Sequence, residues 1–115
     1  MTSFDAGDIV LVRYPFTDLS TSKKRPAVIL SPRTYADRFG DVVLMPLTSQ
    51  PDADTSLAIT QWRVAGLLKP SWVKPIIGTL ATRLVEKHLG KVAATDEQCI
   101  RAALAVLLEA RWTRS

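Results

Sequence analysis

The sequence predicts a mainly β (α+β) fold, in which a small, strongly curved antiparallel sheet or barrel precedes one C-terminal helix. Short apolar runs separated by turn residues fill most of the first two-thirds of the 115-residue chain. No long helical pattern separates these runs, which argues against a parallel sheet built from βαβ units. Near the C-terminus the apolar period becomes that of a helix, over about residues 95–112.

The first two strands are expected on either side of a polar loop. Ile9–Val12 is continuously apolar, which is typical of a strand covered on both faces. A segment rich in Thr, Ser and Lys then extends from Pro15 to Lys24 and predicts a loop. The second strand is expected over Pro26–Leu30, where Ser31-Pro32 ends it.

Three more strands are expected in the middle of the chain. They run from Asp41 to about Ser49, from Leu57 to Trp62, and from Trp72 to Leu80. Pro46 would remove one hydrogen-bond donor from the first of these, which predicts an edge position or a bulge. Pro75 and Gly78 interrupt the last one.

The C-terminal segment carries one apolar stripe at helical spacing. The stripe contains Ile100, Ala103, Leu104, Leu107, Leu108 and Arg111-Trp112. Thr95 and Gln98 form a capping box, so we expect the Thr95 side chain to cap the helix. A short helical turn is expected near Thr82–His88. No repeat or linker interrupts the chain, so we expect a single domain over residues 1–115, strand-rich over 7–80.

The composition excludes several kinds of chemistry. The single Cys99 allows no internal disulfide and no cysteine-cluster zinc site, which suits a reducing, cytoplasmic location. His88 is the only histidine, so no pair of histidines can act as acid and base. The zinc-protease, CxxC, P-loop, GxGxxG and GxSxG motifs are all absent. Asp52 and Asp54 are interpreted as solvated loop carboxylates, so we expect neither a metal nor a cofactor.

No membrane segment is expected. The longest stretch without a charged residue is Val42–Pro51, whereas a spanning helix needs about 20 apolar residues. Asp5 and Asp8 precede the first basic residue, Arg13, which is the wrong order for a signal peptide.

The net charge of +4 is unevenly distributed. Residues 57–91 contain six basic residues against Glu86 alone, a net charge of +5. A second basic cluster is the Lys23-Lys24-Arg25 triplet. Both clusters favour a polyanionic partner. A basic surface that serves only solubility is the alternative interpretation.

Arg25 and Thr48 are the candidate catalytic residues. Arg25 opens the second strand directly after the polar loop, and a guanidinium there can hold a phosphate through two hydrogen bonds. Thr48 ends the third strand, which can lie beside the second in an antiparallel sheet, so its hydroxyl could face the same phosphate. The alternative is a salt bridge for Arg25 and a turn hydroxyl for Thr48.

A series of sequence blocks extends this interpretation. In order, the blocks are Gly7–Val12, Tyr14–Asp18, Lys24–Ser31, Leu47–Ser49, Gly66–Ser71, Lys74-Pro75, Thr79-Leu80 and Leu89–Val92. Together they resemble the MazF/PemK family, the toxins of type II toxin–antitoxin pairs. The blocks cover nearly the whole chain, and the ordered set that includes Lys24-Arg25-Pro26 is specific.

The resemblance implies an SH3-like small β-barrel of about five to seven antiparallel strands with a C-terminal helix. It also implies a metal-independent, sequence-selective endoribonuclease that cleaves single-stranded RNA, often messenger RNA. In that family the 2′-hydroxyl attacks the adjacent phosphate. The family's catalytic pair is the arginine of an Arg-Pro motif and a threonine that ends the following strand, which correspond to Arg25 and Thr48.

The resemblance further implies an RNA-binding surface, a homodimer and a cognate antitoxin that is acidic where it covers the basic site. RNA contacts are expected from the loops after the first and third strands. The candidate RNA-binding residues are Phe16, Thr17, Ser22, Lys23, Lys24, Ser49, Gln50 and Lys74. Trp62 and Trp72 are further candidates for stacking on bases, although a core position suits them equally well.

Two alternatives to a nuclease stay open. One is a catalytically inactive or gyrase-poison-like member of the same fold, which would act by binding a protein or RNA target. The other is an SH3-like binding module within a larger assembly.

Overall fold

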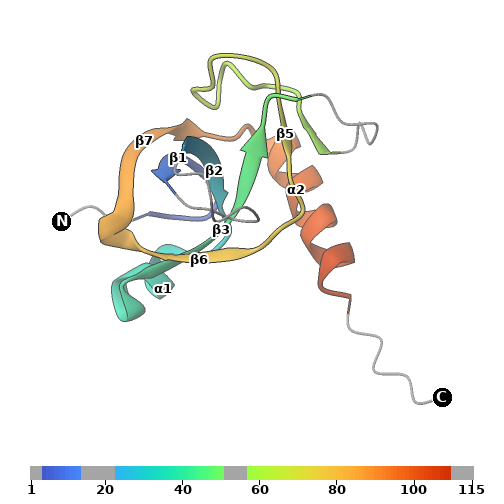
Figure 1. Ribbon diagram of the computed structural model, residues 1–115. Coiled ribbons are helices and arrows are strands. Elements are labelled where there is room, and N and C mark those ends of the chain that lie inside the picture. The colour runs from blue at the N-terminus through green and yellow to red at the C-terminus, as the bar shows by residue number, and fades with distance from the viewer. Residues whose placement is uncertain (1–3, 14–22, 51–56, 110–115) are drawn as a thin grey trace.

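The computed structural model describes residues 4–13, 23–50 and 57–109 (Figure 1). It confirms the mainly β fold with a C-terminal helix. In chain order, the elements are β1 (Asp8–Arg13), β2 (Lys24–Ile29), α1 (Arg33–Phe39), β3 (Asp41–Thr48), β4 (Ala58–Ile59), β5 (Ser71–Val73), β6 (Gly78–Ala81), the 3₁₀ helix η2 (Thr82–Leu84), β7 (Val85–Lys91) and α2 (Ala94–Leu107).

The strands form one antiparallel sheet that curls strongly (Figure 1). Neighbouring strands follow the order β4-β5-β3-β2-β1-β7. β6 pairs with the first half of β3, whereas β5 pairs with its end. β2 and β3 are antiparallel neighbours, as the sequence predicted, with Ala27 opposite Pro46 and Val28 opposite Met45. The pairing brings the start of β2 to the end of β3.

The central strands bury both of their faces. In β1, Ile9 belongs to one core cluster, which contains Val28 and Met45. Its neighbour Val10 belongs to the other, which contains Ala27. This arrangement confirms the interpretation of the continuous apolar run. Helix α2 packs on the first cluster through Ile100.

Two elements differ from the sequence prediction. Helix α1 was not predicted, although Gly40 follows it as a C-cap with φ of 70°, a backbone conformation that favours glycine. The helical turn expected near Thr82–His88 is confirmed only over η2, because Val85–Lys91 forms β7. This strand exists through its pairing with β1, a contact between distant parts of the chain that local propensity does not reveal.

Three finer predictions also need correction. β3 is an interior strand whose register with β2 has no shift, so Pro46 lies neither at an edge nor at a bulge. It is tolerated where the other side of β3 changes partner, from β6 at Leu44 to β5 at Leu47. The fourth strand is only Ala58–Ile59, because the chain turns at Thr60. The fifth strand, expected over Trp72–Leu80, is divided into β5 and β6, which pair with different parts of β3.

The capping box at Thr95 does not form. Helix α2 begins after Ala93, which makes no side-chain cap, and it ends at Leu107 rather than near residue 112. Asp96 instead points its carboxylate across to another segment. It accepts hydrogen bonds from the Thr60 amide (2.9 Å), the Thr60 hydroxyl (2.7 Å) and the Gln61 amide (2.8 Å). Asp96 thereby ties the helix to the turn after β4.

Replacing Asp96 with asparagine is expected to lower the free energy of unfolding by about 3 kcal/mol. Its side chain is 1% exposed, and an asparagine amide would turn an NH₂ group toward one of these donors. Urea denaturation measures the loss. The matched control is Glu97→Gln, because the Glu97 carboxylate makes only a partly exposed pair with Arg101 (3.1 Å) and should contribute under about 1 kcal/mol. Equal losses in the two variants would contradict the anchoring role.

Candidate functional site

A groove of about 950 Å³ lies between the β1–β2–β7 side of the sheet and the segment that leads into β5. It is lined by Leu11, Lys23, Lys24, Arg25, Pro26, Leu47, Thr48, Ser49, Gln50, Gly66, Leu67, Leu68, Lys69, Ser71, Lys74, Lys87, His88 and Leu89. Five parts of the chain that are distant in sequence therefore build one surface: β1, the start of β2, the end of β3, residues 66–74, and β7.

The charge of the groove is positive. Among the lining residues in the described part of the chain, five are lysines and one is an arginine, and none is acidic. The Lys24 Nζ lies 3.5 Å from Glu86 Oε1. Both side chains are substantially exposed, so this pair is weak and leaves the groove strongly basic. A groove with this charge attracts polyanions.

Arg25 and Thr48 are brought to the same place by the strand register. Ala27 opposite Pro46 is the last pair of the β2–β3 ladder at this end, and Arg25 and Thr48 each lie two residues beyond it on their strands. Residues two positions apart on a strand project to the same face of the sheet, so Arg25 lies on the face of Ala27 and Thr48 on the face of Pro46. Both residues are partly buried and line the groove. A guanidinium and a hydroxyl so placed can bind two oxygens of one phosphate.

Five of the candidate RNA-binding residues line the same groove: Lys23, Lys24, Ser49, Gln50 and Lys74. The backbone amide of Gln50 donates a hydrogen bond to the Thr48 hydroxyl oxygen at 3.2 Å. Phe16, Thr17 and Ser22 lie outside the described residues, as do Asp52 and Asp54. Trp62 and Trp72 do not line the groove. Trp62 packs against the core cluster of Ile9, and the Arg63 guanidinium lies 4.7 Å from the centre of a Trp62 ring.

Several groove residues were not singled out from the sequence. Lys69 and Lys87 add positive charge, while Leu67 and Leu68 add apolar surface. The net charge of residues 57–91 pointed to this region as a whole. It could not identify Lys87 individually, because the groove position of Lys87 depends on the pairing of β7 with β1.

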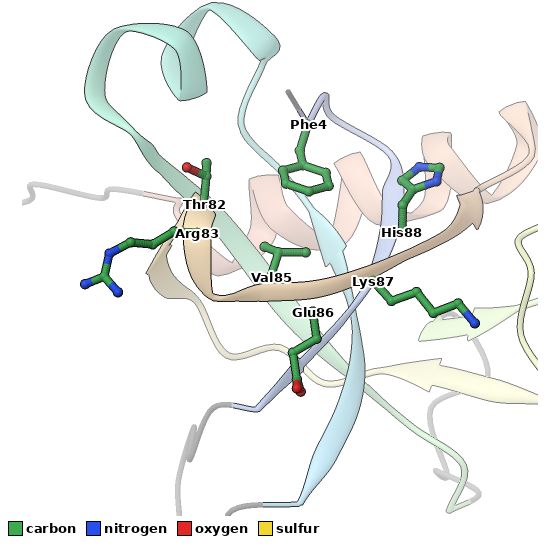
Figure 2. Close-up of a pocket in the computed structure, with 7 residues that line it drawn as sticks. All are labelled: Phe4, Thr82, Arg83, Val85, Glu86, Lys87 and His88. Carbon is green, nitrogen blue, oxygen red and sulfur yellow. The ribbon is translucent and has the colours of Figure 1, made fainter. Parts of the chain in front are cut away.

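A second, smaller pocket of about 550 Å³ lies beside η2 and β7. Figure 2 shows Phe4, Val85 and His88 on one side of β7, whereas Glu86 and Lys87 point elsewhere. His88 Nε2 lies 3.5 Å from Asp8 Oδ1, and the histidine side chain is about half exposed. Across residues 4–13, 23–50 and 57–109, no three His, Cys, Asp or Glu side chains form a group that could hold a metal.

The fold and the groove define a class of protein: a small curled β-sheet protein whose basic groove suits a polyanion. Residues 5–108 match the PemK-like, MazF-like toxins of type II toxin–antitoxin systems. The chain therefore belongs to this family. No curated protein sequence matches the chain.

Solved structures show the same fold. The chain superposes on MazF from Deinococcus radiodurans with a TM-score of 0.77 and 25% identity, covering 96% of this chain and 100% of the other. An endoribonuclease from a mycobacterial species gives 0.74 and 23%, covering 98% of each chain. A mycobacterial endoribonuclease in complex with its cognate antitoxin gives a TM-score of 0.67 and 23% identity. The match covers 98% of this chain and 100% of the other.

Within the described residues, no helix is long and apolar enough to cross a membrane.

Proposed function

We propose that this toxin is a metal-independent, sequence-selective endoribonuclease that cleaves single-stranded RNA, with messenger RNA as its target. The observation that supports the proposal is that Arg25 and Thr48 line one groove whose charged side chains, among the described residues, are basic. Single-stranded RNA supplies the matching negative charge, and its 2′-hydroxyl supplies a nucleophile adjacent to every phosphate.

Arg25 and Thr48 act on the scissile phosphate. The 2′-oxygen attacks phosphorus, the bond from phosphorus to the 5′-oxygen breaks, and the products are a 2′,3′-cyclic phosphate and a 5′-hydroxyl. One proton leaves the 2′-hydroxyl and one is gained by the 5′-oxygen. Negative charge grows on the non-bridging oxygens as the phosphorane forms. Because a guanidinium stays protonated, Arg25 stabilises this charge, and the Thr48 hydroxyl orients the phosphate.

The other groove residues bind the RNA strand on either side of the cleaved bond. Lys23, Lys24 and Lys74 attract flanking phosphates, so binding should weaken steeply as salt concentration rises. Ser49 and Gln50, which follow β3 and line the groove, hydrogen-bond a sugar or a base edge in this proposal. Phe16, Thr17 and Ser22, which precede β2 in the chain, would complete the RNA-binding set.

We also propose a homodimer and a cognate antitoxin as partners of this chain. Among the structures that share its fold are complexes of MazF with MazE from Deinococcus radiodurans and the mycobacterial endoribonuclease with its antitoxin. An antitoxin segment that covers the groove here should be acidic, because the charged groove residues described are basic.

Cleavage of RNA in the presence of EDTA is the decisive test. The purified protein is incubated with a long single-stranded RNA and excess EDTA, and the ends of the fragments are mapped. We expect discrete cuts at a preferred sequence, with 5′-hydroxyl and cyclic phosphate ends. RNA that stays intact while the protein still arrests growth would contradict the proposal and favour binding to a protein target, as in a gyrase poison.

A further inference from the structure

One wall of the groove carries a leucine held out into solvent. Leu68 is 94% exposed, more than any other large apolar residue that the structure describes as exposed, and it lines the basic groove. Its neighbour Leu67 is buried in the core cluster that contains Ile9. Isolated exposed leucines are common on protein surfaces. This one differs because it lies among cationic side chains, where hydration of the lysines makes an apolar group unexpected.

The backbone around Leu68 is firmly positioned. The amides of Gly66 and Leu67 donate to the carbonyl oxygens of Arg63 and Trp62 at 3.1 and 3.0 Å. Gly66 also approaches β7 so closely that a Cβ atom on it would lie 2.1 Å from the Leu89 carbonyl oxygen. On the far side, the Ser71 hydroxyl donates to the Lys69 carbonyl oxygen at 3.0 Å. Leu68 therefore projects from a backbone with fixed contacts on both sides.

A ligand that suits this wall needs negative charge and an apolar face close together. A simple polyanion satisfies the lysines but leaves Leu68 in water. An unpaired nucleotide satisfies both, because its phosphate is anionic and the face of its base is apolar. In a duplex these faces are stacked on one another and are not accessible. The groove and Leu68 together thus fit single-stranded RNA with an exposed base.

We propose that Leu68 packs against the face of an unpaired base in the bound RNA and that Lys69, beside it, binds a phosphate of the same strand. This inference rests on the proposed function, since it assigns the base-contacting residue of that groove. Leucine offers no hydrogen bonds, so the contact selects an unstacked base and orients the strand. It contributes to the choice of cleavage site through the shape of the base.

The test measures binding of strands whose 2′-hydroxyls carry methyl groups, so that the proposed nucleophile is absent and cleavage does not interfere. The probes are a short fluorescein-labelled single-stranded RNA of mixed sequence and an abasic strand of the same length, followed by fluorescence anisotropy. Leu68→Ala is expected to raise Kd for the RNA by about three- to tenfold and to leave Kd for the abasic strand unchanged. Lys69→Ala should weaken binding of both strands and reduce the salt dependence.

Val64→Ala is the matched control, because Val64 is 63% exposed in the same segment and does not line the groove. It should change neither Kd. Unchanged RNA affinity in Leu68→Ala would overturn the inference and favour a role of Leu68 in binding a protein. An equal loss with the abasic strand would overturn it as well. If the wild type binds RNA with this base-dependent contribution yet does not cleave it, the proposed function fails while the base contact stands.

Discussion

Replacing Arg25 with alanine is expected to reduce kcat/KM for single-stranded RNA by about 10³-fold, and Thr48→Ala by about 10²-fold. Arg25 offers two hydrogen bonds and a positive charge to a phosphate that gains charge as the phosphorane forms. Thr48 offers one neutral hydroxyl. Thr48→Ser should therefore stay within about tenfold of wild type, whereas Arg25→Lys should lose most of its activity because an ammonium cannot bind two oxygens in the same planar geometry.

The activity is measured from initial cleavage rates in EDTA on an RNA that contains one preferred site. The control is Arg101→Ala, which removes an exposed arginine on α2 that pairs with Glu97 and does not line the groove. Thermal unfolding of each variant shows whether the fold is retained. Full activity in a folded Arg25→Ala variant would remove this residue from the mechanism and the main support for the proposed function.

Substitution of Gly66 with alanine is expected to destabilise the protein by about 3 kcal/mol or more, the largest stability effect that we predict. Two causes act together at this position. Its φ of 84° is strained for any residue with a Cβ atom, and that atom would lie 2.1 Å from the Leu89 carbonyl oxygen. Neither the backbone of β7 nor the segment before β5 can move without disturbing the groove.

Two other glycines separate these causes. Gly40 also has a positive φ, of 70°, but an added Cβ atom meets nothing within 4 Å, so Gly40→Ala should cost only about 1 kcal/mol. Gly90 has no positive φ, but its Cβ atom would lie 2.4 Å from the Ala65 carbonyl oxygen, so Gly90→Ala reports the steric clash. Urea denaturation of the three variants gives the comparison. A loss in Gly66→Ala no larger than that in Gly40→Ala would show that the close approach does not constrain the fold.

Much of the candidate site could be predicted because it depends on local sequence. The apolar runs and turn residues placed the ends of β2 and β3 near Arg25 and Thr48, and the antiparallel pairing of these strands is confirmed. The basic triplet Lys23-Lys24-Arg25 at the start of β2 marked a basic surface for the same reason. The catalytic and RNA-binding roles of these residues stay predictions until the variants are tested.

Other features could not be predicted, because their cause lies in contacts between distant parts of the chain. The prediction for Thr95 was wrong because Asp96, one position later, binds the turn at Thr60 and Gln61. Pro46 predicted an edge or a bulge in its strand because proline lacks a backbone hydrogen-bond donor. Its interior position depends on where β3 exchanges one partner strand for another.

The sequence by itself determined the class of fold, the first three strands, the terminal helix and the two residues proposed to act on phosphate. These properties follow from apolar periodicity, turn residues and a short specific motif, all of which are read along the chain. Only the tertiary structure decided that β7 closes against β1, and that Gly66 and Gly90 bring the segment before β5 against it. This close approach joins Lys69, Lys87 and Leu68 to the groove of Arg25, because backbone contact between distant segments decides which side chains share a surface.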